Sequence, residues 1–183
     1  NSTNCKITGC HMFNIASSAI YLQGGDRETL KPSNNIIENN YIHAVNYRPG
    51  DRFAITMHET VGITVSHNEF DDLPHAAIDI RKSNDITIEY NTISHALYFD
   101  SDMGSIYWGR DNTTMGIVVR YNYFRDFETD LWAIQDGYGD GVFWDDGAVG
   151  PELYGNVFYN GARHYSSIRA NGGEVQNVYN NLI

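Results

Sequence analysis

Residues 63–70 read ITVSHNEF, and the same phrase returns at residues 86–93 as ITIEYNTI and at residues 117–124 as IVVRYNYF. Each copy is a short β-branched run that is followed by Asn, one further residue and a large apolar residue. Looser copies of the phrase are centred on four further positions: Cys10, Asn40, Asn156 and Asn181. The seven positions lie 23 to 34 residues apart. This spacing, without any 3.6-residue periodicity, indicates a solenoid of short strands.

A second phrase of four residues lies between successive copies of the first. It occurs at residues 19–22, 54–57, 77–80, 105–108, 141–144 and 167–170. Its second and fourth residues are nearly always large and apolar, so strand alternation predicts that they face the core. The predicted inward row is Ile55, Ile78, Ile106, Val142 and Ile168. The third residue of the phrase varies and is expected to face solvent. The predicted outward row is Thr56, Asp79, Tyr107, Phe143 and Arg169.

The two phrases together predict an all-β chain that folds as a right-handed parallel β-helix of about six to seven coils. We expect residues 1–183 to form one β-helix domain that is a piece of a longer β-helix. Asn68, Asn91 and Asn122 should be buried and stacked on neighbouring coils, because their side chains can bond to one another and to buried turn backbone. A β-barrel or β-sandwich is the alternative fold, and it would not require a repeated buried Asn.

The composition limits the partners of the chain. Its formal charge of −11 argues against nucleic acid and against an anionic membrane surface, both of which attract clustered Lys and Arg. No run of 18 apolar residues is present, so membrane insertion is not expected. Aromatic residues make up 13% of the chain, which fits a polysaccharide or oligosaccharide substrate. Cys5 and Cys10 do not match a zinc-site spacing and are expected to be buried thiols.

Several stretches resemble a known group of proteins. They are residues 104–111 (GSIYWGRD), 120–124 (RYNYF), 142–148 (VFWDDGA) and 154–158 (YGNVF). The chain is similar to the parallel β-helix superfamily of polysaccharide lyases and glycoside hydrolases. More narrowly, these stretches resemble the bacterial β-helix glycoside hydrolases that include α-L-fucosidases and xylanases. The resemblance covers residues ~35–183, and it implies a secreted, periplasmic or cell-surface protein that acts on carbohydrate.

The catalytic candidates are four aspartates. Asp145 and Asp146 follow a strand that ends at Trp144, so two carboxylates leave the sheet at one point. Crowded carboxylates raise the pKa of one of them, which supplies an acid beside a base. Asp111 lies one coil earlier at the same strand end, within the ~5–9 Å that glycosidase pairs need. Asp102 precedes the strand of the coil that contains Asp111, so it lies at the opposite strand end. All four could instead cap turns, because Asp-Asp-Gly is also ordinary turn chemistry.

The substrate-binding candidates lie on the outward face of the four-residue phrase and just beyond it. They are His58, Asp79, Arg81, Tyr107, Arg110, Phe143 and Arg169. Coils ~4.8 Å apart would join these side chains into one surface that suits an extended sugar chain. The alternative is that a solvated sheet face is simply polar. No metal site and no cofactor are expected, although Asp clusters suit Ca²⁺.

Three functions remain open at this point. A glycoside hydrolase would pair Asp145 or Asp146 with Asp111 or Asp102. A polysaccharide lyase would remove a proton beside a uronate with Arg or Lys, and Ca²⁺ or Arg would neutralise the carboxylate. The acidic face and the presence of only three lysines disfavour the lyase. A non-catalytic glycan-binding or adhesive β-helix would keep the aromatic residues without needing the carboxylates.

Overall fold

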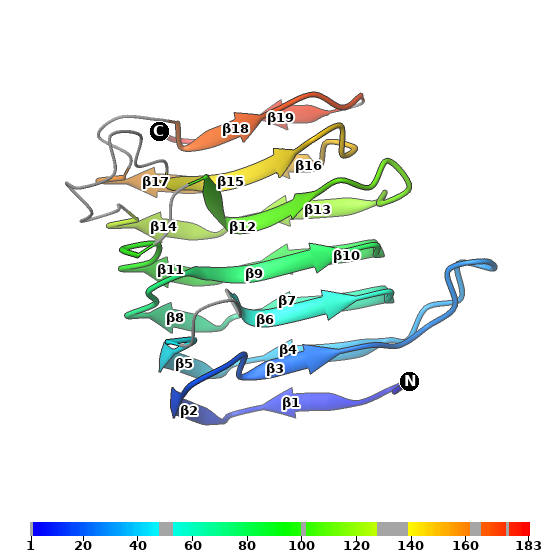
Figure 1. Cartoon of the computed structure of the whole chain (residues 1–183), viewed down its shortest axis with the longest axis horizontal. Helices are drawn as coiled ribbons and strands as arrows, with labels where there is room; N and C mark the ends of the chain where they lie inside the picture. Colours follow the sequence, from blue (N-terminus) through cyan, green and yellow to red (C-terminus); the bar gives the residue numbers. More distant parts are fainter. Residues whose placement is uncertain (1, 48–52, 100–101, 128–138, 162–165, 175) are drawn as a thin grey trace.

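The computed structural model describes residues 2–47, 53–99, 102–127, 139–161, 166–174 and 176–183. Within these ranges the chain forms 19 short strands, which stack coil upon coil from the N-terminal to the C-terminal end (Figure 1). The described residues include no helix that could span a membrane.

Six coils each contribute one strand to each of three parallel sheets, and β19 adds a seventh strand to the first sheet. Sheet A contains β1 (Lys6–Thr8), β4 (Asn35–Glu38), β7 (Val61–Ser66), β10 (Asn84–Glu89), β13 (Ile117–Arg120), β16 (Glu152–Tyr154) and β19 (Asn177–Tyr179). Sheet B contains β2 (His11–Ile15), β5 (Tyr41–Val45), β8 (Glu69–Asp71), β11 (Thr92–Ser94), β14 (Tyr123–Arg125) and β17 (Val157–Tyr159). Sheet C contains β3 (Ile20–Leu22), β6 (Phe53–His58), β9 (Ala76–Arg81), β12 (Met103–Gly109), β15 (Gly139–Asp145) and β18 (Ile168–Ala170).

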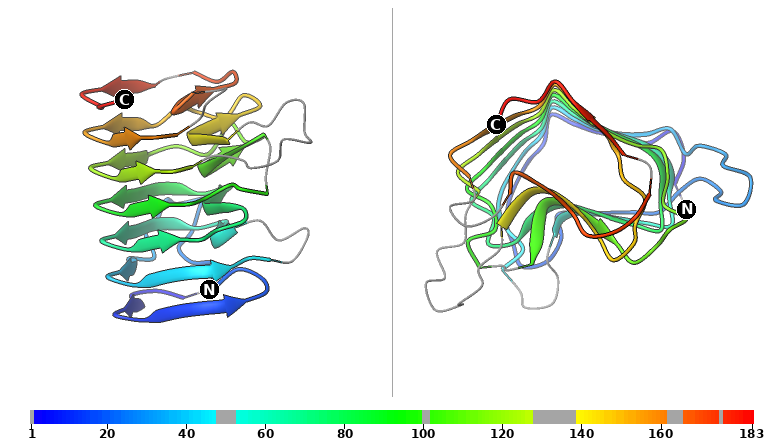
Figure 2. Two further views of the ribbon diagram at one scale, coloured as in Figure 1. Left: turned by 90° about the vertical axis from the view of Figure 1, so that its left-hand side faces the viewer. Right: turned by 90° about the horizontal axis from the view of Figure 1, so that it is seen from above.

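Every strand pairs in parallel with the equivalent strand of the next coil. In sheet C, for example, Ile55 aligns with Ile78, and Ile106 aligns with both Ile78 and Val142. Seen from above, successive coils therefore lie over one another around a common interior (Figure 2). This architecture confirms the parallel β-helix of six to seven coils that the repeated phrases predict.

The Asn ladder is present at the turn between sheets A and B. The Asn91 Oδ1 atom accepts hydrogen bonds from the backbone N–H and the Nδ2 of Asn68, at 2.9 and 3.0 Å. The Asn91 Nδ2 in turn donates to the Asn122 Oδ1 at 3.0 Å and to the Val65 carbonyl at 2.9 Å. Asn68, Asn91 and Asn122 are all buried, so the predicted ladder is confirmed. Cys10 occupies the ladder position of the first coil, where its N–H donates to Asn40.

The ladder offsets the cost of a sharp turn. The residue before each Asn has a positive φ, as at His67 (54°), Tyr90 (55°) and Tyr121 (56°). This left-handed conformation costs a non-glycine residue roughly 1–2 kcal/mol. Each inward Asn compensates for that cost by bonding to backbone groups that the turn would otherwise leave unsatisfied.

The interior is filled by rows of stacked apolar side chains. Ile55, Ile78, Ile106 and Val142 are fully buried, as the four-residue phrase predicts. Ile168, the fifth member of that row, is only partly buried and packs against the edge of the core. In the same sheet the rings of Trp108 and Trp144 stack inside the coil with their centroids 5.9 Å apart.

The outward row is more covered than the sequence predicts. Thr56, Asp79 and Phe143 are buried, and the expectation that they face solvent is wrong. Phe143 nevertheless lies outside the central core cluster, and the Arg169 guanidinium covers its ring at 4.4 Å from the centroid. Long side chains of neighbouring coils therefore cover part of the outer face of sheet C, which alternation alone does not predict.

The two cysteines also differ from expectation. Cys5 and Cys10 are free and exposed, not buried. Both lie in the first coil, where β1 and β2 each pair with one neighbouring strand only. Their thiols therefore lack the second neighbouring coil that covers equivalent side chains elsewhere in the stack.

Candidate functional site

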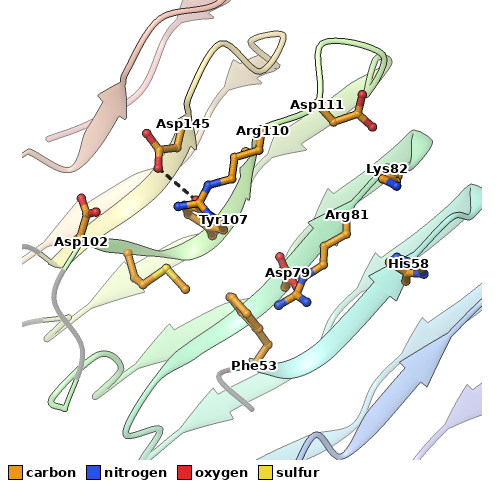
Figure 3. A pocket seen from close by; sticks show the side chains of 12 residues that line it. Phe53, His58, Asp79, Arg81, Lys82, Asp102, Tyr107, Arg110, Asp111 and Asp145 are labelled. Carbon is orange, nitrogen blue, oxygen red and sulfur yellow. Dashed lines mark hydrogen bonds and ion pairs between the residues drawn. The ribbon is translucent and has the colours of Figure 1, made fainter. Parts of the chain in front are cut away.

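A pocket of about 570 Å³ opens on the outer face of sheet C (Figure 3). We call it the face pocket. It is lined by Phe53, His58, Asp79, Arg81, Lys82, Asp102, Met103, Tyr107, Gly109, Arg110, Asp111 and Asp145. Most of these residues belong to β6, β9, β12 and β15, so four consecutive coils build one concave surface.

Parallel register decides which side chains meet in the face pocket. Tyr107 aligns with Asp79 on the coil before it and with Phe143 on the coil after it. Gly109, two residues along the same strand, aligns with Asp145. A Cβ atom at Gly109 would lie 2.8 Å from the Tyr107 hydroxyl and 3.1 Å from the Asp145 Cβ. The glycine therefore leaves room for the Tyr107 ring to reach Asp145.

Asp145 is an acid of the face pocket that three hydrogen bonds hold in place. Its Oδ2 accepts a hydrogen bond from the Tyr107 hydroxyl at 3.1 Å. Its Oδ1 accepts from the Asn171 Nδ2 at 2.7 Å and from the Asp146 N–H at 2.8 Å. A carboxylate has about four acceptor positions, so one remains for a water molecule or a substrate hydroxyl. Burial and the neighbouring Asp145 raise the pKa of Tyr107, which keeps its hydroxyl protonated as the donor.

Asp79 is the second distinctive acid. Its side chain is almost completely buried, and the Arg81 Nε contacts its Oδ2. Burial raises the pKa of Asp79 to about 7, although the charge and hydrogen bond of Arg81 oppose the rise. The Arg81 guanidinium also lies over the Phe53 ring, 5.5 Å from its centroid. Asp79 is thus a carboxyl group that loses its proton only around neutral pH, well above the usual range.

This raised pKa predicts a particular dependence of stability on pH. A carboxyl group with a higher pKa in the folded state than in the unfolded state binds its proton more tightly when folded. Its contribution to stability is therefore present below its unfolded value of 3.8 and is lost as the pH rises through about 7. We expect the free energy of unfolding of wild type, minus that of Asp79→Asn, to fall between pH 4 and pH 7 in urea titrations.

The matched control for this measurement is Asp85→Asn. Asp85 is exposed and lies on sheet A, and Asn tolerates its positive φ of 56° as well as Asp does. A difference between wild type and Asp79→Asn that stays constant from pH 4 to pH 7 would contradict the assigned pKa.

The other catalytic candidates lie in different surroundings. Asp146 does not line the face pocket, and its exposed carboxylate accepts a hydrogen bond from the Arg110 Nε at 3.0 Å. Asp111 lines the pocket, but it caps its own turn by accepting hydrogen bonds from the Thr113 N–H and hydroxyl at 2.9 and 2.6 Å. These bonds lower the pKa of Asp111 despite its partial burial, with a further contribution from Arg27.

Asp102 lies at the far end of the face pocket and forms an ion pair with Arg169 at 3.4 Å. The Arg169 side chain also approaches the fully buried Asp140, at 3.6 Å. Burial raises the pKa of Asp140 to about 6, against the effect of Arg169. Arg169 and Phe143 were both predicted to bind substrate, but neither lines the pocket. The Arg169 guanidinium instead lies over the Phe143 ring.

The face pocket contains three residues that the sequence did not predict as site residues: Phe53, Lys82 and Met103. All three lie beside a four-residue phrase or a predicted site residue. Phe53 and Met103 precede the phrases that begin at residues 54 and 105, and Lys82 follows Arg81 directly. The strands of sheet C are longer than the four-residue phrases. A prediction based on the phrases alone therefore does not include these residues.

The described residues contain no group of three or more His, Cys, Asp or Glu side chains that could hold a metal ion. The face pocket offers a carboxyl group of raised pKa, a carboxyl group fixed by three hydrogen bonds, a tyrosine hydroxyl and three cationic side chains. This combination can transfer protons and can position a polar, uncharged or partly anionic ligand.

Comparison with known proteins yields one match. A family model described as "Right handed beta helix region" matches residues 1–183. No curated protein matches the chain. No solved structure matches it either.

Proposed function

Because this chain belongs to the right-handed β-helix family, whose members are commonly carbohydrate-active, we propose that it is a glycoside hydrolase whose active site is the face pocket. The observation that carries the proposal is the pairing of two unlike carboxyl groups on one sheet. Burial raises the pKa of Asp79 to about 7, whereas both oxygens of Asp145 accept hydrogen bonds, three in all. An acid beside a base is the requirement of glycosidic bond cleavage.

The spacing of the two acids favours an inverting reaction. Asp79 and Asp145 lie two coils apart, which is ~10 Å along the helix axis at ~4.8 Å per coil. Asp145 also lies two residues further along the strands than Asp79, because Asp79 aligns with Tyr107 and Asp145 with Gly109, so their Cα atoms are ~12 Å apart at ~3.3 Å per residue. This separation is too long for the ~5–5.5 Å of a retaining pair and leaves room for a water molecule between the carboxyl groups. Asp79 would protonate the leaving oxygen, and Asp145 would take a proton from the attacking water. Tyr107 and Asn171 are positioning residues that orient Asp145.

The remaining residues of the face pocket suit a sugar chain. Phe53 and Tyr107 supply two roughly parallel rings, 6.3 Å apart between centroids, against which a sugar can pack. Arg81, Lys82 and Arg110 supply hydrogen-bond donors for hydroxyl or carboxylate groups. The coils run across the pocket at regular spacing, which suits a substrate that extends along the helix axis.

A polysaccharide lyase is the alternative that these three cations favour, because they could neutralise a uronate. The raised pKa of Tyr107 counts against it, since a lyase that used this tyrosine as its base would need the deprotonated form. A glycan-binding module without turnover is the third candidate, and it would need only the rings and the cations.

The first experiment is a screen of fucosylated, xylan-type and uronate-containing glycans. We expect new reducing ends without absorbance in the ultraviolet, and we expect the first product to have the inverted anomeric configuration by proton NMR. Unsaturated products that absorb near the ultraviolet edge would support the lyase. Binding without any product across the screen would support the binding module.

The second experiment is the pH dependence of kcat/KM on a cleaved glycan. Asp79 acts as an acid only while protonated, so kcat/KM should fall about tenfold per pH unit above pH 7. The fall should persist in His58→Gln, because the acid is Asp79 and not the imidazole that also lines the pocket. A profile that stays flat from pH 6 to pH 9 would contradict the role of Asp79.

A further inference from the structure

We propose that His11 and His43 form a binding site for a divalent transition-metal ion, and that Cu²⁺ binds there most tightly. The site lies on the outer face of sheet B, whereas the face pocket lies on sheet C. The two imidazoles come from β2 and β5, and their Nε2 atoms are 2.8 Å apart.

The register of the two strands explains why the rings meet. His11 aligns with Tyr41, and Phe13 aligns with His43. Met12 and Ile42, which lie between these residues, point toward the core, so all four rings stand on the outer face. They form a two-by-two array with the histidines on one diagonal. A diagonal of this kind brings long side chains within reach of one another.

Neighbouring rings hold both imidazoles in place. The Tyr41 ring stacks on His11 at 5.1 Å and on His43 at 4.4 Å between centroids. The Phe13 ring is nearly parallel to His43, with an angle of 8° between their planes. Folding therefore already restricts the rotamers of both histidines, so metal binding costs little further side-chain entropy.

The separation of the two nitrogens matches a chelate. Two imidazole nitrogens at 2.0–2.1 Å from one ion are ~2.9 Å apart at a right angle and ~3.3 Å apart at the tetrahedral angle. The observed 2.8 Å is closest to the right angle, which is typical of tetragonal Cu²⁺ and Ni²⁺ sites. Without metal, one ring must donate its Nε2–H to the other. With metal, both rings carry their hydrogen on Nδ1, so binding releases no proton from the neutral pair.

The surrounding charge also favours a cation. Asp71 and Glu69 on β8 align with His43 and Tyr41, respectively, and add negative charge on the next coil. The chain as a whole carries a formal charge of −11. Water would complete the coordination, because no group of three or more metal-ligating side chains occurs among the described residues.

The test is a Cu²⁺ titration followed by electron paramagnetic resonance. It uses the full chain with Cys5→Ser and Cys10→Ser, because exposed thiols reduce Cu²⁺. We expect one tight site per chain with hyperfine splitting from two equatorial nitrogens. His11→Asn and His43→Asn should each weaken binding at least about tenfold and remove one nitrogen from the spectrum, since even indirect changes at metal sites cost that much.

His67→Asn is the matched control, because His67 stacks on Tyr90 at the turn between sheets A and B, outside the array of four rings, and should not affect binding. His11→Gln and His43→Gln repeat each loss with a second substitution, and far-UV circular dichroism confirms that every variant is folded. An equal Cu²⁺ affinity in the parent and in folded His11 and His43 variants would overturn the proposal. Absence of a nitrogen-coordinated site in the parent chain would overturn it as well.

Discussion

Asp145→Asn is expected to lower kcat on a susceptible glycan by about 10²–10⁴-fold, which is the usual contribution of a general acid or base. The amide keeps the shape of the carboxylate: its oxygen in the Oδ1 position can still accept hydrogen bonds from Asn171 and the Asp146 N–H, and its Nδ2 can donate to the Tyr107 hydroxyl oxygen. It cannot take a proton from water at neutral pH. The loss should therefore appear in kcat, with a thermal unfolding midpoint close to that of wild type. Asp79→Asn should reduce kcat to a similar extent, because the buried amide has no proton to give to the leaving group.

Asp146→Asn distinguishes the contribution of Asp146 to catalysis from that of its neighbour Asp145. Asp146 is exposed and does not line the face pocket, although it accepts a hydrogen bond from Arg110, which does, so its neutralisation should leave kcat near the wild-type value. Asp85→Asn on sheet A controls for the general effect of removing one negative charge. A large loss in Asp146→Asn together with full activity in Asp145→Asn would reverse the assignment. Full activity in both Asp145→Asn and Asp79→Asn, with turnover present in wild type, would place the active site elsewhere.

Asn91→Ala is expected to lower the free energy of unfolding by at least about 3 kcal/mol. Asn91 lies in the middle of the ladder, with Asn68 before it and Asn122 after it. Alanine would leave the buried Asn68 N–H without its partner and would remove the Nδ2 donor from the Val65 carbonyl. Each buried polar group that loses its partner costs about 1–3 kcal/mol, and the vacated side-chain volume adds a cavity.

Urea titration at neutral pH measures this loss, with Asn112→Ala as the control. Asn112 is exposed in a turn, and its replacement should change stability by no more than about 0.5 kcal/mol, as is usual for surface positions. Equal stabilities of Asn91→Ala and wild type would show that the ladder is not a source of stability. A solenoid can unfold coil by coil, so circular dichroism and tyrosine fluorescence should be compared to test whether the transition is cooperative.

The repeated phrases were sufficient to predict the fold because the coils use one local pattern many times. Inward Ile residues follow from alternation within a strand, and the Asn ladder follows from a turn that recurs at one place in each coil. Stacking equivalent positions then places His58 beside Arg81 and Gly109 beside Asp145, so the column of candidate residues was also predictable. The first phrase reaches only the start of each sheet B strand, so its copies include His11 and Tyr41 but not His43. The register of β2 and β5 decides that His11 meets His43.

Only the tertiary structure decided which aspartates are buried, which have a raised pKa and which line the face pocket. Asp79 occupies an outward position, and from the sequence it is an ordinary solvated carboxylate. It becomes buried because Arg81 and the residues of neighbouring coils cover it, and burial raises its pKa to about 7. Likewise, Asp145 and Asp146 are equivalent in the sequence, yet the positive φ of Asp146 turns its side chain toward Arg110. Strand alternation depends on neighbours in the chain, whereas desolvation depends on atoms contributed by other coils, and that difference separates what the sequence determines from what the fold adds.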